Sequence, residues 1–280
     1  MKFPRKDYSW PLSVCHFSTW DKVKVAKDFV LSDRWTLDSH VCEFEKKMAE
    51  FVGSKYALFV SSGSTANSLL AMYVRDNLSK TEPNRKKVVF PAVTWITSVS
   101  PWIREGFDPQ FIDIHPSNLC INPRLLDRWL EIHASEVACV FPTSLLGFVP
   151  DIDDLVEVCL KHGVTLMLDN CEGTFSEWKG NNLSGLFTST TSTYFGHCLQ
   201  TIKGGFVFTN DPDVYAYCLM ARDHGLTRCL RIAPFEIENK DQYLNKNVDS
   251  RFDFYCLGSN FRNTELHALL GLIDLKKAES

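Results

Sequence analysis

The stretch Tyr56-Ala-Leu-Phe-Val-Ser-Ser-Gly-Ser-Thr-Ala-Asn67 joins an apolar run to a turn of small residues. The run Tyr56–Val60 predicts a short strand, and the pattern after the turn predicts a helix that continues to about Leu78. Free backbone N–H groups at a helix N-terminus attract anions, and Gly63 lets an anion come close to the backbone. The stretch therefore predicts either an anion site or a serine that caps an ordinary helix.

Strand and helix patterns alternate on both sides of this stretch. Apolar runs predict strands at 87–90, 109–114, 136–141 and 164–168, and amphipathic patterns predict helices at 38–51, 123–132, 152–162, 210–224 and 263–277. This alternation predicts an α/β fold with a central, mostly parallel sheet flanked by helices. Ligands of such sheets bind beyond the carboxyl ends of the strands, where Gly63 and Ser64 follow one strand and Asp169 follows another.

Asp169 ends its apolar strand in the run Leu166-Met-Leu-Asp-Asn-Cys-Glu172. A carboxylate in that position acts as a solvated cap, a metal ligand or the partner of a cofactor's protonated nitrogen. No histidine or second aspartate lies close by in sequence, so a metal site is not expected.

A second informative stretch is Thr191-Ser-Thr-Tyr-Phe-Gly-His-Cys-Leu-Gln-Thr-Ile-Lys-Gly-Gly-Phe-Val-Phe-Thr209. It places one histidine, His197, before the Gly204-Gly205 turn and an apolar run that predicts a strand. Spacing alone leaves His197 as either a structural or a catalytic histidine.

Composition excludes several classes of protein. The net charge is −4 with scattered Lys and Arg, which gives no electrostatic basis for binding nucleic acid or an anionic membrane. No apolar run is long enough to span a bilayer, and the first residues lack the apolar core of a signal peptide. The ten cysteines form no CxxC pair. These features predict a cytoplasmic protein with reduced thiols.

Three regions are expected along the chain. Residues 1–35 carry aromatics and prolines without a clear period and are predicted to form a largely irregular arm. Residues 36–250 are predicted to form a large α/β domain, with a polar loop at 227–250. Residues 251–280 are predicted to begin a further C-terminal region.

The chain resembles the sugar aminotransferase family, the DegT/DnrJ/StrS group, from about residue 15 to the end. The runs that carry the resemblance occur in the family's order: Gly53-Ser-Lys-Tyr-Ala57, Ser61-Ser-Gly-Ser-Thr-Ala-Asn67, Phe90-Pro-Ala-Val-Thr-Trp95, Phe111-Ile-Asp-Ile114, Leu168-Asp-Asn-Cys-Glu172 and Gly258-Ser-Asn-Phe-Arg262. The resemblance implies a type I fold of the pyridoxal-phosphate-dependent transferases. Relatives continue into a small C-terminal domain, which is expected to be largely missing here.

In most of that family, a lysine shortly before a Glu-Gly-Gly turn forms the Schiff base with the cofactor. Gly204-Gly205 fixes the register, and His197 stands at the lysine position. This exchange marks a sub-branch of sugar 3-dehydratases and implies that His197 is a catalytic base. A histidine with an ordinary pKa near 6.5 can take up and return a proton at neutral pH.

The resemblance implies a lyase that uses pyridoxal 5′-phosphate or pyridoxamine 5′-phosphate. It would remove the C3 hydroxyl of a GDP-linked 4-keto-6-deoxyhexose, a nucleotide sugar of deoxysugar and O-antigen lipopolysaccharide biosynthesis. L-Glutamate is the implied amino donor, and a homodimer is the implied assembly.

The resemblance also implies a set of residues around the cofactor and the substrate. By position these are Gly63, Ser64, Ser192 and Asn260 for the phosphate, Trp95, Asp169 and Glu172 for the ring, and Arg262 for the acidic co-substrate. Two of these assignments have plain structural alternatives. Trp95 is otherwise a buried aromatic at a strand end, and Asn260-Phe-Arg262 is otherwise a turn with a surface charge.

The chain departs from the family pattern near the histidine. Cys198 replaces a usual second histidine, and Lys203 replaces the usual glutamate before Gly-Gly. Lys203 raises a rival hypothesis, an aminotransferase in which this lysine forms the Schiff base. A non-catalytic cofactor-binding homologue is a third hypothesis. Cys218 and Cys229 stand too far apart for the Cys-x-Cys pair of iron–sulfur-dependent relatives, so no cluster is expected.

Overall fold

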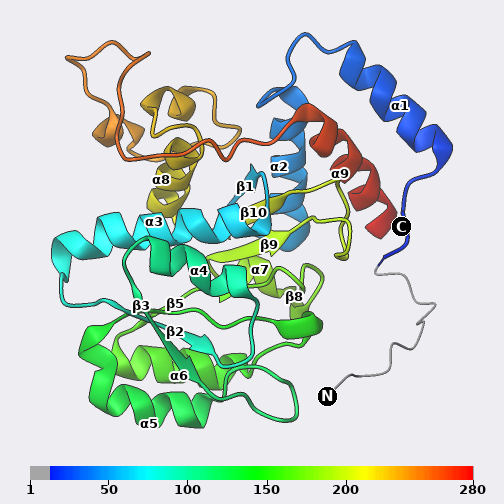
Figure 1. Ribbon diagram of the computed structural model, residues 1–280. Helices are drawn as coiled ribbons and strands as arrows, with labels where there is room; N and C mark the ends of the chain where they lie inside the picture. The colour runs from blue at the N-terminus through cyan, green and yellow to red at the C-terminus, as the bar shows by residue number, and fades with distance from the viewer. Residues whose placement is uncertain (1–12, 280) are drawn as a thin grey trace, which may run out of the picture.

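A mixed β-sheet lies at the centre of the protein, whose computed structural model describes residues 13–279 (Figure 1). The order across the sheet is β3 (Asp108–Ile112), β2 (Lys87–Pro91), β4 (Val137–Val140), β5 (Thr165–Leu166) with β6 (Leu168–Asp169), β9 (Ser189–Ser192), β10 (Gly205–Thr209) and β1 (Tyr56–Val60). Strand β10 is antiparallel to both of its neighbours, and the other pairs are parallel. The predicted α/β architecture is confirmed.

The two halves of the sheet meet at Met167, between β5 and β6. Its N–H donates to the Val140 carbonyl on one side at 3.1 Å, and the Leu168 N–H donates to the Thr188 carbonyl on the other at 3.0 Å. The pair β5–β6 therefore continues as one strand that changes partner along its length and ends at Asp169, as predicted.

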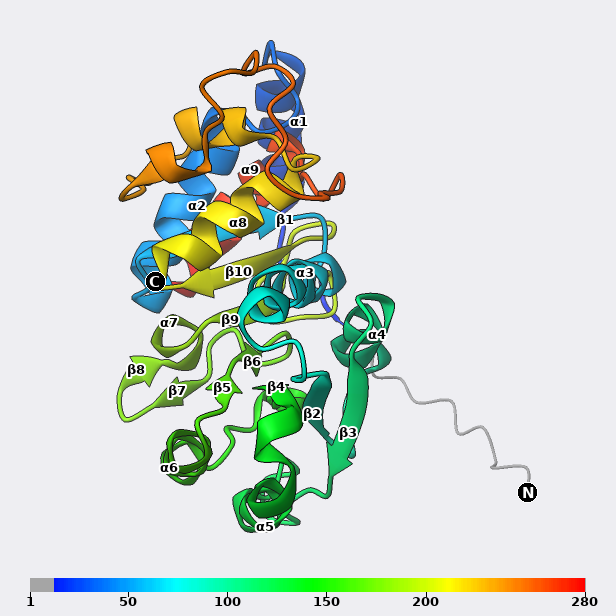
Figure 2. The same cartoon turned by 90° about the vertical axis from the view of Figure 1, so that its left-hand side faces the viewer.

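Helices cover both faces of the sheet because side chains alternate along each strand. Leu58 and Val60 face α3 (Gly63–Thr81), α4 (Ile96–Arg104) and α8 (Pro212–Arg222). Ala57 and Phe59 face α2 (Ser39–Val52) and α9 (Glu265–Ala278). Further along that second face lie α5 (Pro123–His133) and α6 (Ile152–His162), beneath β2 and β4 (Figure 2).

The predicted irregular arm at 1–35 is wrong for its second half, because residues 19–30 form helix α1 (Thr19–Val30). Ser18 accepts the Asp21 N–H, and Asp21 accepts the Ser18 N–H in return. This reciprocal capping box starts the helix, and the sequence of the helix has no strong apolar stripe from which it could be predicted. Residues 1–12 lie outside the described part of the chain.

Smaller elements complete the structure. The predicted loop at 227–250 holds two short 3₁₀ turns, η3 (Thr227–Arg231) and η4 (Lys240–Tyr243). The others are η1 (Ala134–Glu136), η2 (Leu145–Gly147), α7 (Leu183–Leu186) and the hairpin of β7 (Glu177–Trp178) with β8 (Asn181–Asn182). Among the helices of residues 13–279, none combines the length and apolar character that a membrane crossing needs.

Helix α9 is joined to α2 by a carboxylate. Asp38 precedes α2 but makes no side-chain cap. The buried Glu265 instead accepts the backbone N–H groups of Asp38, His40 and Val41 at 2.8, 2.8 and 3.2 Å. An acceptor with a negative charge suits the positive end of a helix. The segment after residue 251 is thus hydrogen-bonded to α2, which belongs to the large domain predicted at 36–250. The boundaries predicted between the three regions stay predictions.

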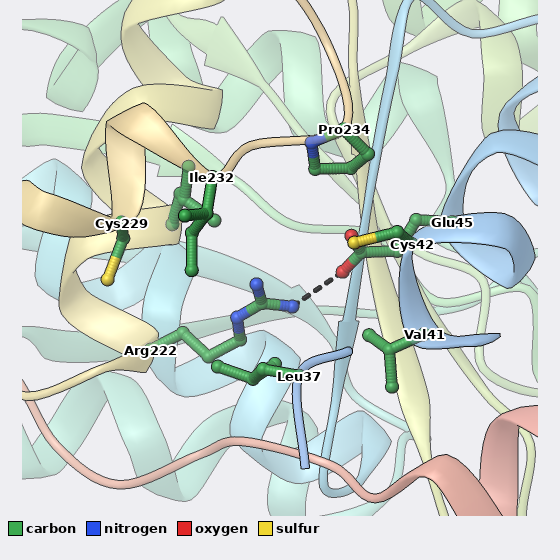
Figure 3. Close-up of a pocket in the computed structure, with 9 residues that line it drawn as sticks. Leu37, Val41, Cys42, Glu45, Arg222, Cys229, Ile232 and Pro234 are labelled. Atoms are coloured by element: carbon green, nitrogen blue, oxygen red, sulfur yellow. Dashed lines mark hydrogen bonds and ion pairs between the residues drawn. The ribbon is translucent and has the colours of Figure 1, made fainter. Parts of the chain in front are cut away.

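A buried ion pair braces β1 from both sides. Arg222 of α8 lies 2.5 Å from Glu45 of α2, beside a small cavity of about 20 Å³ (Figure 3). Glu45 accepts the Phe59 N–H at 2.8 Å, and Arg222 donates to the Phe59 carbonyl at 2.8 Å. Burial raises the pKa of Glu45, and the charge of Arg222 opposes that rise.

Substitution Arg222→Ala should destabilise the fold by about 3–5 kcal/mol, because it leaves the Glu45 carboxylate buried without its cation. Urea unfolding followed by circular dichroism measures the change. Arg251→Ala, which removes an exposed partner of Asp249, is the control and should have little effect. Equal losses for Arg222→Ala and Arg251→Ala would contradict the role given to the pair.

Candidate active site

A cavity of about 780 Å³ opens at the sheet edge where β1, β4, β6 and β9 end. The residues predicted from the sequence that line it are Gly63, Ser64, Trp95, Asp169, Glu172, Ser192 and His197. The structure therefore brings together side chains from segments far apart in the chain. This position agrees with the rule for ligands of open α/β sheets.

The turn after β1 caps the helix that follows it and leaves room for the anion site predicted there. The Ser62 hydroxyl accepts the Thr65 N–H at 3.1 Å, and Thr65 Oγ1 accepts the Ser62 N–H at 3.0 Å. This is a capping box, so the serine does cap the helix. The N–H groups of Gly63 and Ser64 lie in the first turn of α3, where a helix offers no carbonyl partner, and both residues face the cavity. Capping and anion binding are thus compatible here.

Close packing explains the glycines of this region. A Cβ on Gly63 would lie 2.7 Å from Cys171 Sγ and 3.0 Å from Ser192 Cβ. A Cβ on Gly205 would lie 2.5 Å from the Gly63 nitrogen. The separations of 2.7 and 2.5 Å are too short for non-bonded atoms, so a side chain at either position would force its neighbours apart.

Asp169 places a buried carboxylate at the bottom of the cavity. It is 1% exposed, and it accepts the Asn67 Nδ2–H at 3.0 Å and the Cys171 N–H at 3.1 Å. Within residues 13–279 no Lys, Arg or His pairs with it. Burial, with a contribution from the Asp169 charge, raises the pKa of the Cys171 thiol well above its usual range. The carboxylate is therefore held by neutral donors and faces the cavity without a cation.

His197 is half-buried in the cavity wall. Its backbone N–H donates to the Tyr194 carbonyl at 2.9 Å. The imidazole of His197 and the ring of Tyr194 meet edge to face with centroids 5.8 Å apart. Its Nδ1 is buried and has no hydrogen-bond partner among the described residues. A structural histidine is normally satisfied by such a partner, so the free ring nitrogen favours a functional histidine.

Trp95 is 65% exposed and immediately precedes α4. The alternative of a buried strand-end aromatic is therefore wrong, because Trp95 lies beyond the end of β2, at the start of α4, where its indole is exposed. Glu172 accepts the Leu146 N–H at 2.5 Å, which fixes its carboxylate at the cavity wall. The roles predicted for these two side chains toward a cofactor stay predictions.

Asn260 and Arg262 do not line this cavity. Arg262 donates through Nε to Asn260 Oδ1 at 3.0 Å and pairs with Asp223 at 3.3 Å. The two residues are thus bound to each other beside α8, and their predicted roles in binding phosphate and co-substrate stay predictions.

Several lining residues were given no role from the sequence. They are Ser62, Asn67, Thr97, Ser98, Thr143, Leu145, Leu146, Cys171, Tyr194, Gly196 and Gly204. Asn67 had a usable signal, because it lies four positions after Gly63 and so on the same side of α3. No three acidic, histidine or cysteine side chains of the described residues are grouped to hold a metal ion.

Lys203 and Cys198, the two departures from the family pattern, line the same cavity. Burial, followed by the charge of Lys203, lowers the pKa of His267 from 6.5 to about 4. The His267 imidazole is hydrogen-bonded to Thr264 at the start of α9. Lys203 therefore lines the cavity and also acts electrostatically on His267 at the N-terminus of α9.

Comparisons with known proteins agree with this geometry. The sequence profile of the DegT/DnrJ/EryC1/StrS aminotransferase family matches residues 19–280. GDP-4-keto-6-deoxy-D-mannose 3-dehydratase of Yersinia pseudotuberculosis is 30% identical over 267 residues, which cover 94% of this chain and 66% of that protein. GDP-perosamine synthase of Caulobacter vibrioides is 24% identical, over 85% of this chain and 57% of its own length. The chain thus spans at most about two thirds of the length of these relatives.

Solved structures match as well. The E. coli GDP-4-keto-6-deoxy-D-mannose-3-dehydratase with bound hydrated PLP superposes with a TM-score of 0.84 and 27% identity, covering 97% of this chain and 68% of that one. A structure of the same enzyme type with a trapped PLP–glutamate geminal diamine also gives 0.84 and 27%, covering 96% of this chain and 68% of that one. The predicted fold class, that of the PLP-dependent aminotransferases, is confirmed.

Substitution Lys203→Met should raise the pKa of His267, because it removes a repelling positive charge. NMR titration of the imidazole measures this shift. In the wild type, unfolding is accompanied by proton uptake at His267 between its ordinary pKa of 6.5 and the folded value of about 4. Stability that is present above pH 6.5 should therefore be lost as the pH falls toward 4.

His267→Gln should reduce that loss of stability, measured by urea unfolding at pH 7.5 and pH 5. Lys246→Met removes one charge from an exposed segment and is the control for Lys203→Met. An unchanged His267 pKa in Lys203→Met, or an equal shift in Lys246→Met, would refute the coupling.

Proposed function

The chain belongs to the DegT/DnrJ/EryC1/StrS aminotransferase family, and we propose that it acts as a nucleotide-sugar 3-dehydratase dependent on pyridoxal phosphate. Its reaction would remove the C3 hydroxyl of a GDP-linked 4-keto-6-deoxyhexose. One observation carries the proposal: His197, with a free buried Nδ1, lines the cavity. The resemblance of the sequence assigns this residue to the position where the family's aminotransferases have a lysine. The relatives with 30% identity support the choice of reaction and of nucleotide.

The residues of the cavity fit the cofactor. Asp169 offers a buried, uncompensated carboxylate to a protonated ring nitrogen. The N–H groups of Gly63 and Ser64, with the Ser192 hydroxyl, suit a phosphate at the start of α3. Trp95 stands at the mouth of the cavity with an exposed face for the ring. When bound in its amine form, the cofactor supplies an amine for the C4 ketone and a ring that accepts electrons.

His197 would move the proton. Its imidazole would act as the base toward the bound cofactor and as the acid toward the C3 oxygen as that group leaves. The edge-to-face contact with Tyr194 holds the plane of its imidazole. A histidine makes no covalent bond to the cofactor aldehyde, so the amine form can enter the cavity or leave it freely.

The remaining partners follow from the same reaction. We propose L-glutamate as amino donor, supported by the relative that holds a PLP–glutamate adduct. Glutamate supplies the nitrogen and two electrons and leaves as 2-oxoglutarate, the sugar loses its C3 hydroxyl as water, and the nitrogen is finally released as ammonia. A homodimer in the cytoplasm, serving deoxysugar and lipopolysaccharide biosynthesis, completes the proposal. No disulfide joins the cysteines of the described residues, which suits a reducing compartment.

A second candidate is a nucleotide-sugar aminotransferase, which is favoured by one observation. Lys203 lines the same cavity as His197, so an amine for covalent attachment of the cofactor is at hand. Transamination would leave nitrogen on the sugar, whereas dehydration removes one oxygen.

The purified protein should convert GDP-4-keto-6-deoxymannose, with pyridoxal phosphate and L-glutamate, to a 3-deoxy product detected by mass spectrometry. His197→Asn should lower the rate by about 10²- to 10⁴-fold, the usual contribution of a general acid–base group. Lys203→Met is the matched control from the same cavity and should keep the reaction.

Borohydride reduction of the loaded protein distinguishes the candidates further. We expect no stable cofactor adduct on any lysine. An aminosugar product together with an adduct on Lys203 would establish the aminotransferase, and cofactor binding without turnover of GDP- or CDP-linked 4-ketosugars would indicate a non-catalytic homologue.

A further inference from the structure

Asn67 is a fully buried amide at the bottom of the cavity, and the reaction scheme above gives it no role. It is 1% exposed and lies on the first turns of α3. Its side chain contacts three other segments: Thr97 in α4, Asp169 at the end of β6 and Thr190 in β9. Few side chains of the cavity wall join so many elements.

The partners of Asn67 determine which way its amide points. The Thr97 carbonyl can only accept a hydrogen bond, so the Asn67 atom 3.0 Å from it must be Nδ2. The same Nδ2 donates to Asp169 Oδ2 at 3.0 Å. The Thr190 hydroxyl donates to Asn67 Oδ1 at 2.6 Å. Two contacts therefore fix the amide with its N–H groups toward the aspartate.

The consequence for Asp169 is a fixed carboxylate plane. Oδ2 is held by Asn67 and Oδ1 by the Cys171 N–H at 3.1 Å, and both donors are neutral. Turned the other way, the amide oxygen would face the carboxylate oxygen and repel it. A carboxylate held in one orientation directs its remaining lone pairs to one point in the cavity.

We propose that Asn67 is a positioning residue, held in its orientation by the Thr97 carbonyl and the Thr190 hydroxyl, that aims the Asp169 carboxylate at the cationic ring nitrogen of the cofactor. This inference rests on the proposed function insofar as it assumes a pyridine cofactor in the cavity. Asn67 acts through Asp169 and does not itself reach the ring nitrogen.

The test uses the full chain loaded with pyridoxal phosphate. Asn67→Ala should raise the cofactor dissociation constant by about tenfold, the low end of what loss of an orienting partner costs. Thr190→Val keeps the shape of the side chain but removes the hydrogen bond to Asn67 Oδ1, so the amide is held by one anchor fewer, and it should weaken binding in the same direction. Thr190 also contacts the Cys171 thiol, so Asn67→Ala, which leaves that contact in place, is the primary variant.

Thr191→Val is the matched control. Thr191 follows Thr190 in β9 and is equally buried, and its hydroxyl has no partner among the described residues. It should bind the cofactor like the wild type. Thermal melting of the unloaded proteins separates loss of folding from loss of positioning, and the Thr190→Val and Thr191→Val pair decides the matter if Asn67→Ala does not fold.

A spectroscopic readout distinguishes positioning from packing. The visible absorption of the bound cofactor should change with pH. The midpoint of this change should lie at a lower pH in Asn67→Ala and Thr190→Val than in the wild type, because a misdirected carboxylate stabilises the protonated ring nitrogen less well. The inference would be overturned if Asn67→Ala and Thr190→Val both titrated and bound the cofactor like the wild type, or if Thr191→Val changed the two readouts equally. A wild-type protein that binds no pyridoxal phosphate would instead refute the proposed function.

Discussion

The structure depends on how the backbone N–H and carbonyl groups on the outer edge of β1 find hydrogen-bond partners. Strand β1 pairs with β10 on one side only. On its other side the N–H and carbonyl of Phe59 are bound by the buried pair of Glu45 and Arg222. An ion pair in the core is costly to desolvate, and these added hydrogen bonds to the backbone are what such a pair needs to be sustained. The charge pair thus takes the place of a further strand and joins α2, β1 and α8.

The cavity inherits its geometry from this bracing. Because β1 is fixed, the capped turn that follows it presents the N–H groups of Gly63 and Ser64 at a defined place. Asn67, one helical turn further on, reaches the carboxylate at the end of β6. The N–H groups of Gly63 and Ser64 and the Asp169 carboxylate are therefore connected through a single helix start, which keeps a constant distance between the groups that we propose to bind the two ends of the cofactor.

Apolar periodicity and turn residues predicted most of the sheet and helices. They missed β9, because Ser189-Thr-Thr-Ser192 is buried without being apolar and is satisfied by hydroxyl hydrogen bonds instead. They missed α1 because a capping box, not an apolar stripe, starts it. The cavity residues on strand ends were predictable because parallel strands end together. Asn67 was predictable only as a residue on the cavity side of α3, because its hydrogen-bond partners are distant in sequence. Asn260 and Arg262 lie outside the cavity.

The closed edge of β1 also bears on how the protein avoids misassembly. Tyr56-Ala-Leu-Phe-Val60 is apolar and uncharged, the kind of segment that pairs with strands of other molecules when its edge is open. Beyond Phe59, the Ser61 N–H is bound by the Phe261 carbonyl and the Val60 carbonyl by Asn263. The segment that leads into α9 thus shields the strand, and its displacement would expose an apolar edge strand that could pair with other molecules.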